Sequence, residues 1–155
     1  MKQVIIFFSL ACVLLACSAS PTGIDEAYVE ALEALLEEKD LEYDIDYISL
    51  FINDSSISER SIEIIQSYFE QTYEKIVFTY TPDEVTHAGP YGKENLAMDG
   101  MFLYVLDIDQ DQDTLTIETA KFHTVHERGA LGLEVIFKEG EHGWVLQAES
   151  VLWRE

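Results

Sequence analysis

The chain has 155 residues, in which 30 Asp and Glu outnumber 9 Lys and Arg and give a net charge of −21 at pH 7. Its length suits one globular domain. So acidic a chain repels nucleic-acid phosphates and anionic lipid headgroups, which argues against a nucleic-acid partner and favours metal cations, basic peptides and basic proteins. The charge is also typical of a surface that only keeps a protein in solution, and both interpretations stay open.

The chain begins with a basic residue, Lys2, followed by an apolar run over residues 4–16. This run is too short for a transmembrane helix, which needs roughly 20 apolar residues, and it has the length of a signal-peptide core. It ends in Leu14-Leu15-Ala16-Cys17. That tract resembles the lipobox of bacterial lipoproteins, although the family pattern prefers a smaller residue at the position of Leu15. The alternative is an ordinary signal peptide with an incidental cysteine.

The lipoprotein resemblance implies that residues 1–16 are removed and that Cys17 becomes an acylated N-terminus, carrying a diacylglyceryl group and a further fatty acid such as palmitate. Two or three acyl chains hold a protein firmly in a membrane, whereas one chain binds only marginally. Residues 17–24 then form a short tether. The protein is expected in the cell envelope, and in the outer membrane of a Gram-negative host, because Ser18 stands where Asp would direct inner-membrane retention. Which side of that membrane it faces stays open.

Residues 25–39 are predicted to form a first helix, because apolar side chains recur at helical spacing and make one stripe. The opposite face is acidic and includes Glu30, Glu33 and Glu37. An acidic helix face is usually solvated, but it also suits docking of a basic partner. These three residues are therefore candidate partner-binding residues.

A second helix is predicted over residues 57–74, because Ser56 and Glu59 match the S-x-x-E capping box and apolar residues follow at helical spacing. Residues 41–52, between the two helices, are ambiguous. They first alternate between apolar and acidic side chains as a strand does, and then become almost continuously apolar, which also suits a helix.

The second half of the chain is predicted to consist of strands joined by turns. A β-branched and aromatic segment at 76–80 is followed by a long irregular stretch at 83–100, where His87 and Tyr91 are further candidate partner-binding residues. Four more strands are expected at about 101–109, 114–125, 132–138 and 143–152. Short connections between them indicate antiparallel pairing.

Helices followed by strands indicate an α+β fold, with two N-terminal helices packed on one face of an antiparallel, mostly meandering sheet, in a single domain over residues 25–155. The layout is similar to that of the cystatin-like and cone-shaped nuclear-transport-factor groups. This is a likeness of architecture only, and no motif chooses between the two.

The segment from Asp107 to Glu118 resembles an EF-hand calcium loop. Acidic residues stand at its first, third, fifth, seventh and twelfth positions, namely Asp107, Asp109, Asp111, Asp113 and Glu118. Gln112, however, replaces the glycine of the sharp turn, and the flanking segments are predicted strands, not helices. The competing interpretation is a polar hairpin tip at 109–113. A weak calcium site is therefore an alternative and is the one cofactor that the sequence indicates.

Other chemistry finds little support in the sequence. His123 and His126 are three apart, which places them on opposite faces of a strand, and no G-x-S-x-G motif or spare cysteine is present. The sequence therefore favours a membrane-anchored, non-catalytic binding, inhibitory or accessory module for a basic protein or peptide. The alternatives are a small-ligand or enzymatic domain, with a pocket between the sheet and the helices, and a weakly calcium-binding envelope protein.

Overall fold

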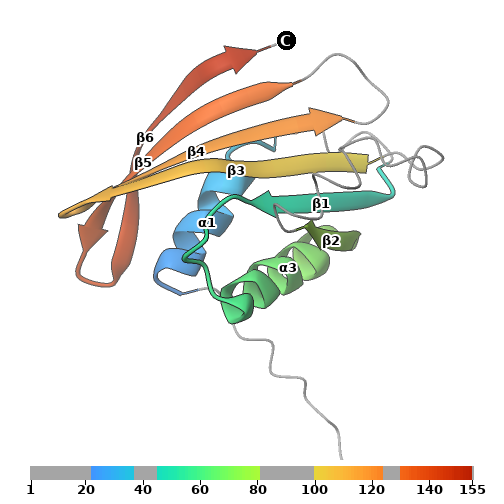
Figure 1. The fold of residues 1–155 in the computed structure, drawn as a ribbon, viewed down its shortest axis with the longest axis horizontal. Coiled ribbons are helices and arrows are strands. Elements are labelled where there is room, and N and C mark those ends of the chain that lie inside the picture. Colours follow the sequence, from blue (N-terminus) through green and yellow to red (C-terminus); the bar gives the residue numbers. More distant parts are fainter. Residues whose placement is uncertain (1–21, 37–44, 81–99, 124–129, 155) are drawn as a thin grey trace, which may run out of the picture.

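A computed structural model describes residues 22–36, 45–80, 100–123 and 130–154 of the chain (Figure 1). These residues form a mixed α/β fold with two helices and one six-stranded sheet. The elements in chain order are α1 (Ile24–Glu33), β1 (Tyr47–Ile52), α3 (Glu59–Tyr73), β2 (Ile76–Tyr80), β3 (Gly100–Asp111), β4 (Thr114–His123), β5 (Leu131–Gly140) and β6 (Gly143–Arg154).

The prediction of two N-terminal helices is wrong, because α3 lies between β1 and β2. The strand order is β2-β1-β3-β4-β5-β6, and β1 runs parallel to both of its neighbours, so the sheet is mixed instead of antiparallel throughout. The physical reason is the helical crossover. A strand that is followed by a helix returns to the sheet in the same direction, whereas a tight turn reverses it.

The last four strands form an antiparallel meander, as their short connections predict. Each is close to its predicted limits, although β3, β5 and β6 extend further. Figure 1 shows these long strands curving around α1, and both helices lying on the same side of the sheet. Register shifts near Val105 in β3, and at two points between β5 and β6, add twist where the sheet bends.

Apolar side chains fill the layer between the sheet and the helices. The helical side of this core includes Leu32 of α1 and Ile65 and Phe69 of α3, each with no exposed surface. Full burial of such a side chain contributes roughly 1.5–3 kcal/mol. The strands contribute their inward-facing residues: Ile48, Leu50 and Ile52 of β1, Val77 of β2, Met101, Leu103 and Val105 of β3, Leu115 and Ile117 of β4, and Leu131, Leu133, Val135 and Phe137 of β5.

The interior position of β1, between β2 and β3, explains its ambiguous sequence. Ile48, Leu50 and Ile52 face the core, while Tyr47 and Ser49 on the other side are also buried. A strand that is buried on both faces reads as a continuous apolar run and loses the alternation that marks a half-exposed strand.

The second helix begins later than predicted. Its N-cap is Ser58, whose Oγ accepts a hydrogen bond of 3.0 Å from the Ser61 backbone N–H. Ser56 instead donates its backbone N–H to the Asp54 carboxylate in the preceding turn. Serine is a favourable N-cap residue at either position, but Ser56 is already hydrogen-bonded in the Asp54 turn, and Ser58 is the cap.

Candidate functional site

The structure describes two of the five predicted partner-binding residues. Glu30 and Glu33 lie on α1 and are half-buried, while Glu37, His87 and Tyr91 lie outside the described residues. Burial, followed by the nearby charges of Glu26, Glu149 and Glu33, raises the pKa of Glu30. Glu30 therefore stands among like charges and next to the sheet, not on a fully solvated helix face.

Glu33 connects the two helices. Its Oε1 accepts hydrogen bonds of 2.9 Å from the hydroxyls of both Tyr68 and Tyr73 of α3. Burial and then the Glu33 carboxylate raise the pKa of both phenols, so the hydroxyls keep their protons. This carboxylate is thus used inside the protein, which makes Glu33 a poor contact for an outside partner.

A second tyrosine–carboxylate contact joins α1 to the turn after β1. Tyr28 donates a 2.5 Å hydrogen bond to Asp54, and burial, then this bond, raises the pKa of the phenol. Burial of Asp54 opposes its ionisation, but the hydrogen bonds from Tyr28 and Ser56 outweigh that effect and lower the pKa of its carboxyl. Asp54 is therefore an ionised acceptor that fixes α1 against the sheet.

The predicted calcium segment is the β3–β4 hairpin. Asp107, Asp109 and Asp111 lie at alternate positions of β3, and Asp111 pairs with Thr114 across the turn. Gln112 has a left-handed φ of 50°, at the position where a calcium loop would have glycine. The fold here is that of a strand hairpin with an acidic tip, and the helices that flank an EF-hand loop are replaced by strands.

The tip of this hairpin is tied to the next one. Asp113 Oδ2 lies 3.3 Å from Lys138 Nζ of β5, and this partner lowers the pKa of the Asp113 carboxyl. Within the described part of the chain, no group of three or more His, Cys, Asp or Glu side chains is placed to hold a metal ion. The calcium site stays a prediction.

The predicted lipid-attachment residue, Cys17, and the predicted leader before it lie outside the described residues. In the ranges that the structure does describe, neither helix has the length and apolarity that membrane crossing requires.

The face of the sheet opposite α1 and α3, the far face, carries a feature that the sequence analysis missed. Aromatic side chains from five strands form a continuous band across it, with successive ring centroids 5.5–6.3 Å apart. Most of these contacts have the edge-to-face geometry that aromatic pairs prefer. The aromatic band consists of Phe78 of β2, Tyr47 and Phe51 of β1, Phe102 and Tyr104 of β3, Phe122 of β4 and Trp153 of β6.

Two glycines make room for rings of this band. A Cβ at Gly100 would overlap the Tyr47 ring, and a Cβ at Gly132 would overlap the indole of Trp153. Trp153 therefore lies over the backbone of β5, and this bridges the band from β4 to the edge strand β6. The band is accessible in part, because Phe78 and Phe122 each keep 39% of their surface exposed, whereas Tyr47 is buried at 1%.

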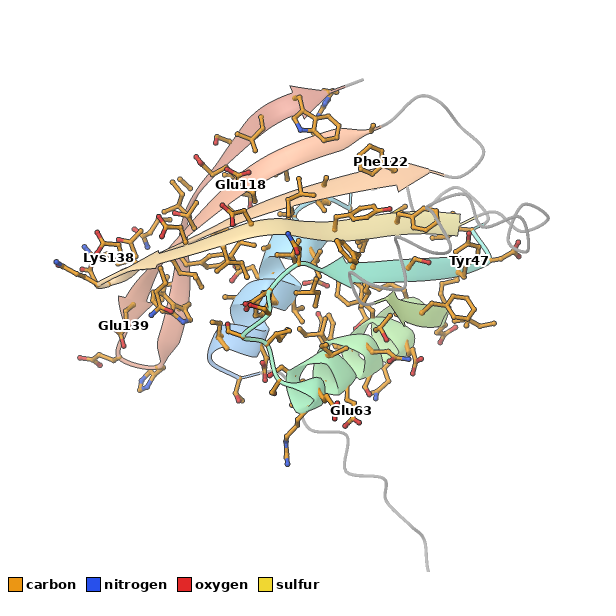
Figure 2. All side chains as sticks on the ribbon, viewed as in Figure 1. Tyr47, Glu63, Glu118, Phe122, Lys138 and Glu139 are labelled. Atoms are coloured by element: carbon orange, nitrogen blue, oxygen red, sulfur yellow. The ribbon has the colours of Figure 1, made fainter. Side chains whose placement is uncertain are left out.

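A row of three carboxylates lies beside the aromatic band on the same face. Asp107 of β3 pairs with Glu118 of β4, and Glu118 pairs with Glu134 of β5, so adjacent strands carry like charges directly opposite one another. Figure 2 shows Glu118 and Phe122 on the side of the sheet away from the helices. The only hydrogen bond to this carboxylate row among the described residues comes from Ser150 of β6, 3.2 Å from Glu134. Such pairing costs stability unless a cation offsets it.

The signal that could have located the far face is present in the sequence. In β3, the odd-numbered residues Met101, Leu103 and Val105 face the core, while the even-numbered Phe102 and Tyr104 face the other side of the sheet. When a strand of an antiparallel meander is apolar at both odd and even positions, an apolar patch is indicated on its second face. The pairing register that joins such patches into one band cannot be predicted from the sequence of any single strand.

Comparison of the chain with protein-family models, curated proteins and solved structures finds no match. The class that the fold and the site define is thus a mixed α/β domain with an aromatic and acidic surface on one face of its sheet.

Proposed function

We propose that this protein is a lipid-anchored, non-catalytic binding or inhibitory module of the cell envelope and that it binds a basic protein or peptide. The observation that carries the proposal is the aromatic band beside the carboxylate row. Exposed aromatic rings supply apolar contact area and attract cations to their faces, and adjacent carboxylates pair with Lys and Arg. In a chain of net charge −21, such a surface favours cationic partners over anionic ones.

The interior gives less support to the alternative of a small-ligand or enzymatic domain. Buried apolar side chains from both helices and five strands occupy the layer where that pocket was expected. A binding function on the surface requires no such pocket. The cystatin-like or cone-shaped layout and the weak calcium site stay predictions beside this proposal.

The anchor is tested by Cys17→Ser, with Cys12→Ser as a matched control inside the leader. We expect the Cys17 variant to leave the membrane fraction and the Cys12 variant to remain there, because only Cys17 follows the lipobox-like tract. Mass spectrometry of the purified protein should show an acylated N-terminal cysteine. An unmodified Cys17, or equal membrane retention of both variants, contradicts the anchor.

The partner is tested by capture from envelope extracts at about 20 mM and about 500 mM salt. Screening shortens the reach of charges from about 30 Å at 10 mM salt to about 3 Å at 1 M. We therefore expect basic proteins to be retained at low salt and released at high salt. Failure to retain any basic protein at low salt contradicts the proposed function.

A further inference from the structure

We propose that the far face binds an amphipathic, basic α-helix of the partner, laid across the strands. This inference rests on the proposed function, and it adds the conformation of the partner and the residues that contact it. It follows from three properties of the far face: its fully paired backbone hydrogen bonds, its dimensions and its charge.

The backbone of the sheet favours a helix over an extended peptide. On the far face the N–H and C=O groups of β1, β3, β4 and β5 are already bonded to the strands on both sides. An extended segment lying on the rings would therefore find no backbone partners, and leaving its own polar groups desolvated is costly. A helix satisfies those groups internally and presents only side chains to the rings.

The dimensions also fit a helix. Six strands spaced about 4.8 Å apart give the aromatic band a length of roughly 24 Å, which equals about 16 helical residues. The carboxylate row crosses β5 two residues from Gly132, over which Trp153 lies, and crosses β4 four residues from Phe122, so it is roughly 7 Å to roughly 13 Å from the rings. A helix with side chains is about 10–12 Å across, so an apolar stripe on the band leaves one flank over the carboxylates. Lys and Arg on that flank reach Asp107, Glu118 and Glu134.

The charge argues against a second copy of the chain on this face. Two copies of net charge −21 would bring carboxylate rows together at the interface, and like charges in a desolvated contact are strongly unfavourable. The same charge repels an anionic membrane surface. A cationic helix is the occupant that both the rings and the carboxylates stabilise.

The test uses the exported full chain carrying Cys17→Ser, which changes none of the described residues and avoids detergent. The probe is an 18-residue peptide with Leu at i, i+3, i+4 and i+7 spacing and Lys elsewhere, and its control is a scrambled peptide of the same composition. Binding is measured by calorimetry at 20 mM salt, and helix content by circular dichroism. We expect the amphipathic peptide to bind at least tenfold more tightly than the scrambled one and to gain helix content when it binds.

Two matched pairs of variants locate the surface. Phe122→Ala should weaken binding at least tenfold, while Ile24→Ala, at a residue equally exposed at 39%, should change it less than twofold. Glu118→Lys should weaken binding similarly, while Glu63→Lys, the same change on the outer side of α3, should have little effect (Figure 2). A photo-crosslinker at the centre of the peptide's Leu stripe should label β3–β6 on the far face. This measurement uses the protein without any far-face substitution, so it does not depend on whether a variant folds.

The remaining outcomes separate the two proposals. Equal binding of both peptides would overturn the helix while leaving the basic partner intact, and no binding of either peptide at 20 mM salt would overturn both. Crosslinks to the outer surface of α1 or α3 would overturn the location. A dimer in sedimentation equilibrium that Phe122→Ala dissociates would assign the far face to a second copy and so overturn the inference.

Discussion

Ser49 has a buried hydroxyl in the interior strand β1. It is 1% exposed, and its Oγ finds no hydrogen-bond partner among the described residues. Its register partners on either side are Phe78 and Phe102, so apolar rings flank the hydroxyl on the far face. A buried hydroxyl without a partner loses its hydration without compensation. The Ser58 hydroxyl, in contrast, has a hydrogen-bond partner, because it caps the first turn of α3.

Ser49→Ala and Ser58→Ala are therefore expected to change stability in opposite directions. Removing the Ser49 hydroxyl should raise the free energy of unfolding by up to about 1 kcal/mol, since it eliminates an uncompensated polar group. Removing the Ser58 hydroxyl should lower it by about 1 kcal/mol, since it leaves an N–H of the first helical turn without its acceptor. Urea unfolding followed by circular dichroism measures both. Destabilisation by Ser49→Ala would show that this hydroxyl has a partner.

Glu33 shows why residue type alone does not define a contact. Its place on an acidic helix face predicts a solvated side chain or a docking contact, yet two tyrosines of α3 donate to the same carboxylate oxygen. Those tyrosines stand 35 and 40 residues further along the chain. The packing of α1 against α3 brings them together, and helical periodicity carries no information about it.

At the scale of elements, the β3–β4 hairpin is closed by a residue under backbone strain. Gln112 has φ 50°, in the left-handed region that costs a non-glycine residue roughly 1–2 kcal/mol. Gly at this position would remove the clash of Cβ with the backbone. Gln110, two residues earlier, lies within β3 and is also exposed to solvent.

Gln112→Gly is expected to stabilise the protein by about 0.5–1 kcal/mol, because relief of the left-handed strain outweighs the greater freedom of the unfolded chain. Gln110→Gly should destabilise it by about 0.5–1 kcal/mol, because glycine weakens a strand interior. Thermal unfolding of the two variants beside the unchanged chain measures the difference. Destabilisation of similar size by both would contradict the turn geometry.

The elements themselves and the antiparallel pairing of the last four strands were largely predictable, whereas the pairing of β1 was not. The segments 114–123 and 131–140 alternate apolar and polar residues, so their period predicts the strands that the structure contains. The parallel pairing of β1 with β2 and β3 depends on where distant segments lie, and a local pattern cannot give it. The aromatic band needs the same long-range register, which is why no single segment of the sequence indicates that Trp153 forms one end of it.

At the scale of the whole molecule, negative charge is the dominant property. With 30 acidic residues against 9 basic ones, the folded chain concentrates like charges in a small volume. Compactness then costs electrostatic energy that the expanded unfolded chain avoids. The few internal compensations that the structure describes include the Lys138–Asp113 ion pair, which is exposed and contributes little.

We expect the midpoint of thermal unfolding to rise as NaCl is increased from 10 to 150 mM, because the Debye length falls from about 30 Å to about 8 Å. A gain on the order of 1 kcal/mol corresponds to about 4 °C for a domain of this size. Replacing the exposed carboxylates Glu59, Glu63 and Glu70 of α3 by Gln should reduce the rise. A midpoint that does not change with salt contradicts the expectation.

The calcium prediction is checked by repeating the thermal unfolding in calcium chloride at the same ionic strength as the NaCl. A calcium site should raise the midpoint further than NaCl does, and an identical shift in the two salts would reject it.

The position of β1 between β2 and β3 has a consequence for the order in which the chain folds. Tyr47 pairs with Gly100 on one side, so the middle of the sheet stays incomplete until residues far along the polypeptide have been synthesised. The hairpins β3–β4 and β5–β6 close over short loops and can form early, whereas β1 must wait for a long loop to close. Until then both apolar sides of β1 are exposed to water. Such distant pairing slows folding and leaves the nascent chain dependent on protection from aggregation.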